Sequence, residues 1–422
     1  MQSVAVVGGG ITGVTTAYAL AQRGFSVTLF ERHRYAAMDT SFANGGQLSA
    51  SNAEVWTHWS TLVKGIKWML KNDAPLLVNP KPSWHKISWF AEFMASMPSY
   101  RQNTIETARL AIAARQHLFA WAEAEGVDFD AKKEGILHIY RDKKGFDHAG
   151  RVSQLLAQGG LERRAVTPEE MRAIEPTLAG QYYGGYFTQS DSTGDIHKFT
   201  QGMAAAAERL GVRCLFGSEV ARVASDGQRA TVTLRHASQQ DATTDHHFDA
   251  LVVCAGVGSR ALAAQLGDRV NIYPVKGYSI TVNLLDEHSQ RAAPTVSLLD
   301  DETKLVTSRL GQDRFRVAGT AEFNGANRDI RADRIRPLID WVNQCFPGVN
   351  TRQVVPWAGL RPMMPNMMPR VGAGRRANVF YNTGHGHLGW TLSAVTADMV
   401  AGQVQSWQQR SGLAPVLVPA AA

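Results

Sequence analysis

The chain has 422 residues, of which 44% are hydrophobic and 19% are charged, and this composition is typical of a globular protein with a large core. The formal net charge of +7 is spread along the chain without aromatic clusters, which argues against a nucleic-acid partner and favours carboxylate substrates or an anionic membrane surface. No apolar run approaches the roughly twenty residues that span a bilayer, and the 3 cysteines are too widely separated to indicate a disulfide framework or a zinc cluster, so we expect no metal site.

The strongest pattern lies in residues 4–31, where an apolar strand runs into a glycine turn and then a helix. Gly8 allows the tight turn, Gly10 lets the backbone approach phosphates, and Gly13 lets the helix pack closely on the strand. Phosphates would meet the positive end of the helix, and Glu31 is placed to accept hydrogen bonds from an adenosine ribose. The motif predicts a dinucleotide site and leaves NAD and FAD open. Because the first strand starts by residue 4, we expect no signal peptide and a cytoplasmic protein.

Within residues 39–187, the sequence predicts first a glycine-containing loop and then a mainly helical segment. Apolar side chains recur at three- to four-residue spacing within residues 55–130, which predicts an inserted set of helices. Residues 136–140 and 182–187 predict strands. Between them, Thr167 and Pro168 predict the start of a helix as its N-cap and first residue.

Alternating strands and helices return after residue 195. We expect a helix over 195–210, strands over 212–216 and 219–223, a hairpin around 239–241 and a buried parallel strand over 250–256. Residues 273–283 and 304–320 alternate like antiparallel strands. The predicted fold class is therefore α/β: a Rossmann-like dinucleotide-binding domain (1–50, 193–270 and 355–422) interleaved with an α+β substrate domain built on an antiparallel sheet (51–192 and 271–354).

Two glycine-containing stretches near the C-terminus predict a second ligand-binding turn. Residues 357–363 predict a turn, and residues 382–391 place glycines directly before an apolar helix over 392–404. The backbone amides at this helix N-terminus suit the negative charge of a reduced flavin. The second motif therefore favours FAD over NAD.

Together these residues resemble the D-amino-acid oxidase superfamily of FAD enzymes, and within it the D-amino acid dehydrogenases. The resemblance covers nearly the whole chain and rests on the opening glycine motif and on residues 40–49 (TSFANGGQLS), 66–69 (IKWM), 274–279 (PVKGYS), 359–362 (GLRP) and 383–386 (TGHG). It implies FAD as cofactor and a D-amino acid as the small-molecule substrate. The implied reaction is oxidation to an imino acid, which water hydrolyses to a 2-oxo acid and ammonia.

The resemblance also implies roles for individual residues. Arg361 of the GLRP turn would bind the substrate carboxylate, for which the forked guanidinium is well shaped. Tyr278 would lie over the substrate, and the carbonyl of His387 would accept a hydrogen bond from the amine. Hydride would then leave Cα toward flavin N5 from a neutral amine, without a strong base. The residues expected to bind FAD are Gly8, Gly10, Ile11, Thr12, Gly13, Glu31, Arg32, Ser41, Asn44, Gly45, Gln47, Leu48, Val220, Ala255, Gly256, Gly386, Leu388, Gly389 and Thr391.

Two departures from the family pattern leave the preferred substrate side chain open. His387 stands where many members have a small residue, and residues 364–368 (MPNMM) replace an Asp-Gly step. The imidazoles of His385 and His387 are interpreted as bystanders, with catalysis as the alternative. Alternative functions are oxidation of D-proline, hydroxyproline or a sarcosine-like amine, an NAD-dependent dehydrogenase, and a flavin subunit that transfers electrons without its own substrate.

The sequence gives less information about the electron acceptor than about the cofactor. Residues 55–100 combine several lysines with the large apolar residues Trp56, Trp59, Trp68, Trp84, Trp89, Phe90, Phe93 and Met94. The first interpretation is that the aromatic residues are core and the lysines solvated. The second is a docking surface for a quinone or another respiratory-chain acceptor, with peripheral contact on the inner face of the cell membrane.

Overall fold

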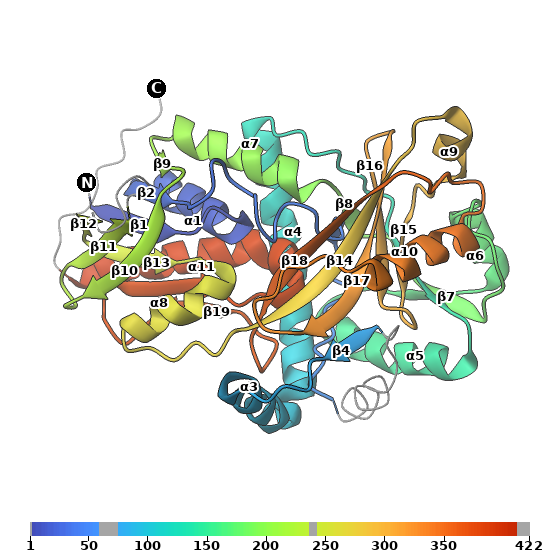
Figure 1. Ribbon diagram of the computed structural model, residues 1–422, viewed down its shortest axis with the longest axis horizontal. Helices are drawn as coiled ribbons and strands as arrows, with labels where there is room; N and C mark the ends of the chain where they lie inside the picture. The colour runs from blue at the N-terminus through green and yellow to red at the C-terminus, as the bar shows by residue number, and fades with distance from the viewer. Residues whose placement is uncertain (1, 59–74, 236–242, 412–422) are drawn as a thin grey trace.

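The computed structural model describes residues 2–58, 75–235 and 243–411 and places them in two adjoining halves, each built on one large sheet (Figure 1). One half holds a six-stranded, mostly parallel sheet, and the other a nine-stranded, mostly antiparallel sheet. This arrangement confirms the predicted α/β fold class. No helix in the described ranges is long and apolar enough to span a membrane.

The six-stranded sheet has the spatial order β19 (Arg370–Ala373), β20 (Val379–Thr383), β13 (Ala250–Val253), β1 (Ser3–Val7), β2 (Ser26–Phe30) and β9 (Arg213–Leu215). Its strands are parallel except at the β19 edge. The β1 residues Val4, Ala5 and Val6 have no exposed surface, as expected for a strand whose sheet is covered on both faces.

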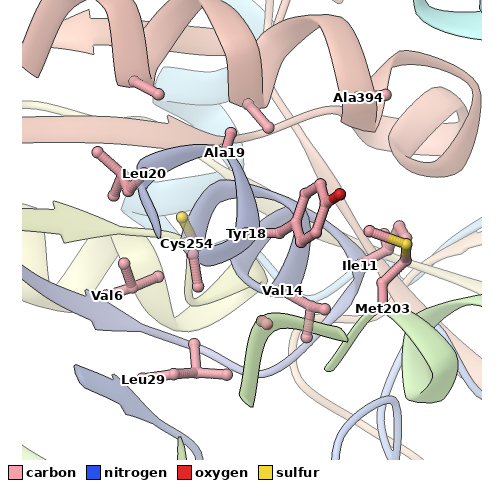
Figure 2. Packing of buried hydrophobic residues seen from close by; sticks show 14 of the residues in the cluster. Val6, Ile11, Val14, Tyr18, Ala19, Leu20, Leu29, Met203, Cys254 and Ala394 are labelled. Carbon is pink, nitrogen blue, oxygen red and sulfur yellow. The ribbon is translucent and has the colours of Figure 1, made fainter. Parts of the chain in front are cut away.

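Helices and a small second sheet cover these two faces. One face packs against α1 (Ile11–Gln22), α7 (Ile196–Arg209) and α11 (Gly389–Arg410), and Figure 2 shows Val6 and Leu29 from the strands gathered with residues of these helices. The other face packs against α8 (Ser259–Gln265) and an antiparallel sheet of β10 (Glu219–Ser225), β11 (Ala230–Arg235) and β12 (Thr243–Phe248). The turn of the hairpin predicted around 239–241 lies outside the described residues.

The nine-stranded sheet has the order β18 (Val354–Met363), β14 (Tyr273–Asn283), β17 (Arg314–Phe323), β16 (Leu305–Leu310), β15 (Ser297–Asp300), β5 (Ile136–Tyr140), β7 (Gly184–Thr188) and β6 (Arg164–Val166), with β4 (Leu76–Val78) beside β17. Side chains along each strand point alternately to the two faces of the sheet. One face of β14, β16 and β17 carries Tyr278, Ile280, Leu305 and Val317 and packs against α10 (Ala332–Cys345). The opposite face looks toward the other half of the protein and carries the site described below.

The remaining elements lie around and between the two sheets. They are α3 (Trp84–Ala95), α4 (Tyr100–Glu125), α5 (Lys143–Gln158), α6 (Pro168–Ile174), α9 (Glu287–Ala292), the short turns η1 (Met97–Ser99), η2 (Gly256–Gly258) and η3 (Gly386–Leu388), and the strand pair β3 (Gln47–Leu48) and β8 (Ser192–Thr193). The long α4 packs against α11 and so ties the helical insertion to the six-stranded half (Figure 1).

Several local predictions match the structure. β5 spans the predicted residues 136–140, and α6 starts with a capping box in which Thr167 and Glu170 bond each other's backbone amides. Part of the helical segment expected within residues 55–130 lies at residues 59–74, outside the described residues, while α3 and α4 form helices within the predicted insertion.

One local prediction is wrong. Residues 359–362 form part of strand β18, not a turn, because every residue from Val354 to Met363 pairs in register with β14. The predicted boundary at residue 355 also falls within β18, which belongs to the nine-stranded sheet. The strand ladder therefore extends the larger sheet past that boundary.

Candidate active site

A cavity of about 680 Å³, called the main cavity below, is lined by residues of both halves. Its walls include the carboxyl ends of β1, β2, β13 and β20 and residues of β14, β17 and β18. Ligands of open α/β sheets bind at such strand ends. Of the predicted site residues, the cavity brings together Gly8, Gly10, Ile11, Thr12, Glu31, Arg32, Ser41, Asn44, Gly45, Gln47, Val220, Ala255, Gly256, Tyr278, Arg361, Gly386, His387, Leu388, Gly389 and Thr391.

Two predicted residues, Gly13 and Leu48, lie behind the cavity wall. A Cβ atom on Gly13 would lie 1.7 Å from the carbonyl oxygen of Gly8, so this glycine lets α1 pack directly against the turn. Leu48 is 2% exposed and packs in the core beside α1. Both therefore support the wall and do not line it.

The glycine turn and the start of α1 form an open cradle, in which the amide of Ile11 donates to Ser41 Oγ at 3.0 Å. Gly8 has φ +113°, a conformation that glycine adopts without strain, and a Cβ there would lie 2.6 Å from the carbonyl oxygen of Cys254. Gly10 is the N-cap of α1 and offers no side-chain cap, and a Cβ added to it would meet only Ser41 Oγ, at 3.5 Å. A backbone this open at a helix N-terminus fits the pyrophosphate of FAD.

The Glu31 carboxylate is fixed at the carboxyl end of β2. Its Oε2 accepts a hydrogen bond from the amide of Gly9 at 2.6 Å, and its Oε1 accepts one from the amide of His33 at 2.8 Å. A carboxylate can accept about four hydrogen bonds. Glu31 therefore keeps acceptor capacity for the ribose hydroxyls that the sequence predicts.

Asp39 connects the two halves at the rim of the main cavity. Both of its oxygens accept hydrogen bonds from the guanidinium of Arg328 at 2.8 Å, and Arg32 donates to one of them at 2.7 Å. Burial alone would raise the pKa of Asp39, but the hydrogen bonds and charges of Arg328 and Arg32 outweigh it and lower the pKa below its usual value. The contact holds the loop after β17 against the loop after β2.

The C-terminal glycine turn carries two neutral imidazoles. His385 is buried, and its Nε2 lies 3.0 Å from Thr396 Oγ1. Burial lowers the pKa of this imidazole to about 3. His387 stacks on Trp56 with ring centres 4.8 Å apart, and burial together with the charge of Arg361 lowers its pKa to about 4. Neither imidazole is protonated near neutral pH, and pKa values this low make both weak bases.

Arg361 is a cation on the wall of the main cavity. It projects from β18 into the main cavity, and its Nη1 donates to the carbonyl oxygen of Thr320 at 2.7 Å. No carboxylate of the described residues lies within ion-pair distance of its guanidinium. Burial lowers its pKa to about 10, so it stays charged near neutral pH. A buried charge without a counter-ion is costly, and an anionic ligand would supply the missing partner.

Two glycines that face each other on neighbouring strands leave the space that the Arg361 side chain occupies. Gly277 of β14 pairs with Gly359 of β18. A Cβ on Gly277 would lie 2.4 Å from Arg361 Cζ, and one on Gly359 would lie 2.1 Å from the ring of Trp357. The guanidinium and the indole therefore lie directly over bare backbone on one face of the sheet.

Thr320 completes this arrangement on the neighbouring strand. It adopts φ +56°, which is unusual for a β-branched residue, next to a register shift between β14 and β17. This local strain accompanies the carbonyl contact to Arg361, as strained backbone often does at functional sites.

Tyr278 does not have the orientation predicted from the family. Its backbone borders the main cavity, but its side chain lies in the core under α10, on the face of the sheet opposite Gly277. The hydroxyl donates a 2.7 Å hydrogen bond to Glu322 Oε2, and burial and then this bond raise the pKa of the phenol. Neighbouring strand residues point to opposite faces, so Tyr278 cannot share a face with Arg361, and we withdraw its role over the substrate.

Three residues of this wall were missed in the sequence: Gly277, Thr320 and Trp357. Alternation along residues 273–283 was a usable signal, because it separates Gly277 from Tyr278 once one face is identified. Thr320 gave no such signal, because a β-bulge depends on how two distant strands pair.

The sequence and the fold were compared with known proteins. The family model described as DAO, FAD dependent oxidoreductase, matches residues 3–403. The chain is 61% identical over 401 residues to D-amino acid dehydrogenase 3 of Mesorhizobium japonicum, covering 95% of this chain and 96% of that protein. It is 40% identical to a D-amino acid dehydrogenase of Paramagnetospirillum magneticum, with 95% of each chain covered.

Solved structures with low sequence identity share the fold. Glycine oxidase from Geobacillus kaustophilus has a TM-score of 0.72 at 20% identity, with 96% of this chain and 95% of that chain covered. L-proline dehydrogenase from P. horikoshii has a TM-score of 0.72 at 16% identity, with 98% of each chain covered. The match over residues 3–403 and the two sequence relatives agree with the FAD cradle described above, and the chain belongs to the DAO family of FAD dependent oxidoreductases.

Proposed function

We propose that the protein is an FAD-dependent D-amino acid dehydrogenase. The substrate loses a hydride from Cα and a proton from nitrogen and becomes an imino acid. Water then adds to the imine carbon and ammonia leaves, which gives the 2-oxo acid. When bound in the cradle, FAD supplies the acceptor for the two electrons.

One observation carries this proposal. Arg361 is a partly buried cation with no carboxylate partner among the described residues, and it lies on the wall of the same cavity as the FAD cradle. Its fork suits a substrate carboxylate. The name D-amino acid dehydrogenase, which two relatives carry at 61% and 40% identity, favours a D-amino acid over other carboxylates.

The other residues of the site orient the substrate. We propose that the backbone carbonyl of His387 accepts a hydrogen bond from the substrate amine, while Arg361 holds the carboxylate. These two anchors fix which face of Cα is presented for hydride loss. The neutral imidazoles of His385 and His387 fit a reaction in which hydride leaves an already neutral amine.

An anaerobic reduction assay tests the proposal. Purified FAD-loaded protein is mixed with D-alanine, L-alanine, D-proline, sarcosine or glycine, and bleaching of the flavin absorption is followed. We expect rapid bleaching by D-alanine and at least about a hundredfold slower bleaching by L-alanine, since a wrongly presented Cα–H forfeits the orientation effect.

The same panel separates the alternatives. Bleaching by D-proline or sarcosine without D-alanine would replace the substrate class by secondary amines. Absence of bleaching by every member of the panel would favour a flavin subunit without its own substrate. A protein that purifies without flavin and does not take up FAD would contradict the cofactor assignment.

We also propose that a quinone or another membrane-associated acceptor takes the electrons, through peripheral contact of α3 with a membrane surface. The Trp84, Ile87 and Met94 side chains are 79%, 51% and 48% exposed, and their spacing places them along one side of α3. The other side of α3 is core, since Trp89 and Phe93 are buried. The buried side of α3 fits the first interpretation of residues 55–100, and the three exposed side chains support the proposed membrane contact.

Vesicle binding tests this second proposal. The protein is sedimented with anionic phospholipid vesicles at low and high salt, beside a variant carrying W84S, I87S and M94S. We expect the natural protein to bind and the variant to bind at least about tenfold less, because each buried apolar side chain contributes roughly 1.5–3 kcal/mol. Equal binding of both proteins, or binding of neither, contradicts the proposed contact.

A further inference from the structure

Three alternating residues form a continuous row on one wall of the main cavity. Asn52, Glu54 and Trp56 are partly exposed and line the cavity, while the intervening Ala53 and Val55 are 0% and 2% exposed. The row therefore presents an amide, a carboxylate and an indole toward the cavity. No step of the proposed reaction uses these three side chains.

The row lies beside the proposed substrate anchors. Trp56 stacks on the imidazole of His387, and the carbonyl oxygen of Asn52 is 3.4 Å from His387 Nε2. The charge of Arg361 acts on the same imidazole and lowers its pKa. A substrate held by Arg361 and by the backbone of His387 would therefore extend its side chain along a wall that includes this row.

Glu54 is the reactive member of the row. Its Oε1 accepts a 2.6 Å hydrogen bond from the hydroxyl of Tyr100, and His148 Nε2 lies 3.8 Å from the same oxygen. Its Oε2 accepts no hydrogen bond from the residues that the structure describes, and the side chain is 31% exposed. One carboxylate oxygen is thus held in place, while the other has no hydrogen-bond partner among the described residues.

Within the described parts of the chain, no lysine or arginine forms an ion pair with Glu54. Lys304 forms an ion pair with Asp301. Arg163 lies in a recess of about 30 Å³ that adjoins Glu54, but its guanidinium sits over the ring of Tyr186, 5.1 Å from the ring centre. His148 Nε2, 3.8 Å from Glu54 Oε1, carries a charge only when the imidazole is protonated.

We propose that Glu54 selects D-amino acids with a cationic side chain, such as an ammonium or a guanidinium. This proposal rests on the proposed function, since it assigns the side-chain end of the same substrate. The free Oε2 would accept a charge-assisted hydrogen bond from the cation, and Trp56 would cover the methylene chain. Tyr100 would hold the carboxylate rotamer.

Paired substrates test the proposal with the FAD-loaded enzyme and a redox dye at pH 8. D-Lysine and D-norleucine have the same carbon chain and differ in the terminal ammonium. We expect kcat/KM to be at least about tenfold higher for D-lysine, the scale of a hydrogen bond to a charged group. We expect Nε-acetyl-D-lysine, whose head group is neutral, to lose this advantage.

Two variants locate the effect. Glu54→Gln keeps an acceptor for Tyr100 but removes the charge, and it should bring the D-lysine to D-norleucine ratio near one. Glu106→Gln on the exposed side of α4 removes the same charge from a residue that does not line the main cavity and should leave the ratio unchanged. The ratio cancels differences in FAD loading between preparations.

The outcomes separate this proposal from the proposed function. D-Norleucine oxidised as well as D-lysine by the natural enzyme, or a ratio that Glu54→Gln does not change, overturns the role of Glu54 and leaves the D-amino acid activity standing. If D-lysine, D-norleucine and D-alanine all fail to reduce the flavin, the proposed function itself has failed. If Glu54→Gln does not fold, the comparison of D-lysine with its Nε-acetyl derivative still decides.

Discussion

The two ends of the main cavity are built in different ways. The nucleotide end centres on one short stretch, residues 8–31, whose glycines make a turn and let α1 pack directly on it. The proposed substrate end comes from β14, β17 and β18, which are far apart in the sequence and meet only through strand pairing. Local chemistry therefore specifies the cofactor, while strand register specifies the substrate contacts. The variants below alter one end at a time.

Arg361→Ala should remove the proposed substrate anchor and leave the nucleotide end intact. Losing one partner of a buried charge pair costs about 3 to 5 kcal/mol, which corresponds to a loss of kcat/KM for D-amino acids of roughly 10²- to 10³-fold or more. Steady-state assays with a redox dye measure it, and the flavin spectrum checks FAD content. Arg336→Ala on the exposed side of α10 is the matched control, since its side chain is 83% exposed. Near-normal turnover of Arg361→Ala would remove this residue from the site.

Gly13→Ala should damage the nucleotide end. The added Cβ would lie 1.7 Å from a backbone oxygen, so the helix must move away from the turn. We expect a loss of about 3 kcal/mol, at the upper end of overpacking costs, and poor FAD retention. Thermal unfolding and the ratio of flavin to protein absorption measure both effects. Gly402→Ala in α11 meets no atom within 4 Å and should not destabilise. Full FAD occupancy and unchanged stability of Gly13→Ala would contradict the packing role.

Gly277→Ala tests the position of the Arg361 guanidinium separately from its charge, because it displaces the side chain without removing the charge. A Cβ 2.4 Å from Cζ must push the guanidinium aside. Misplacing a binding group by about 1 Å can cost 10²-fold, so we expect KM for D-amino acids to rise by roughly 10- to 10²-fold with FAD retained. Measured KM and kcat separate this from a general loss of activity. An unchanged KM would show that the guanidinium can shift without loss of binding.

Arg328→Gln should have the smallest effect on stability of these variants. It weakens the partly exposed contact with Asp39 that joins the two halves of the protein. Side chains this exposed contribute only about 0.2–1 kcal/mol. The pKa of Asp39 is depressed in the folded protein, so its stabilising contribution is present above its ordinary pKa and is lost as the pH falls through the folded value. Thermal unfolding at pH 7 should therefore separate the variant from the natural protein, and the difference should shrink as the pH falls below about 4. A difference that grows on acidification would contradict this sign.

The sequence was sufficient for whatever depends on neighbours along the chain. The glycine turn, the capping box at Thr167 and strand β5 follow from local patterns, and their positions agree with the structure. The FAD family follows from the same motifs. The wall around Arg361 did not follow, because the pairing of Gly277 with Gly359 and the bulge at Thr320 exist only after distant strands meet.

The error over Tyr278 has the same origin. Gly277 and Tyr278 are adjacent in the motif that carries the family resemblance, but adjacent strand residues point to opposite faces. Glu54 was also not singled out, because its importance comes from Trp56 and His387, which are brought together by a stacking contact between distant parts of the chain. Residues that are neighbours in a motif need not be neighbours in a site.

A crystal structure of the FAD-loaded protein with a bound 2-oxo acid would test the central claim most directly. We predict that the pyrophosphate of FAD lies against Gly10 at the N-terminus of α1 and that the carboxylate of the 2-oxo acid is bound by the guanidinium of Arg361 over Gly277. A carboxylate bound away from Arg361, or an Arg361 that forms an ion pair with a carboxylate of the protein itself, would contradict the account.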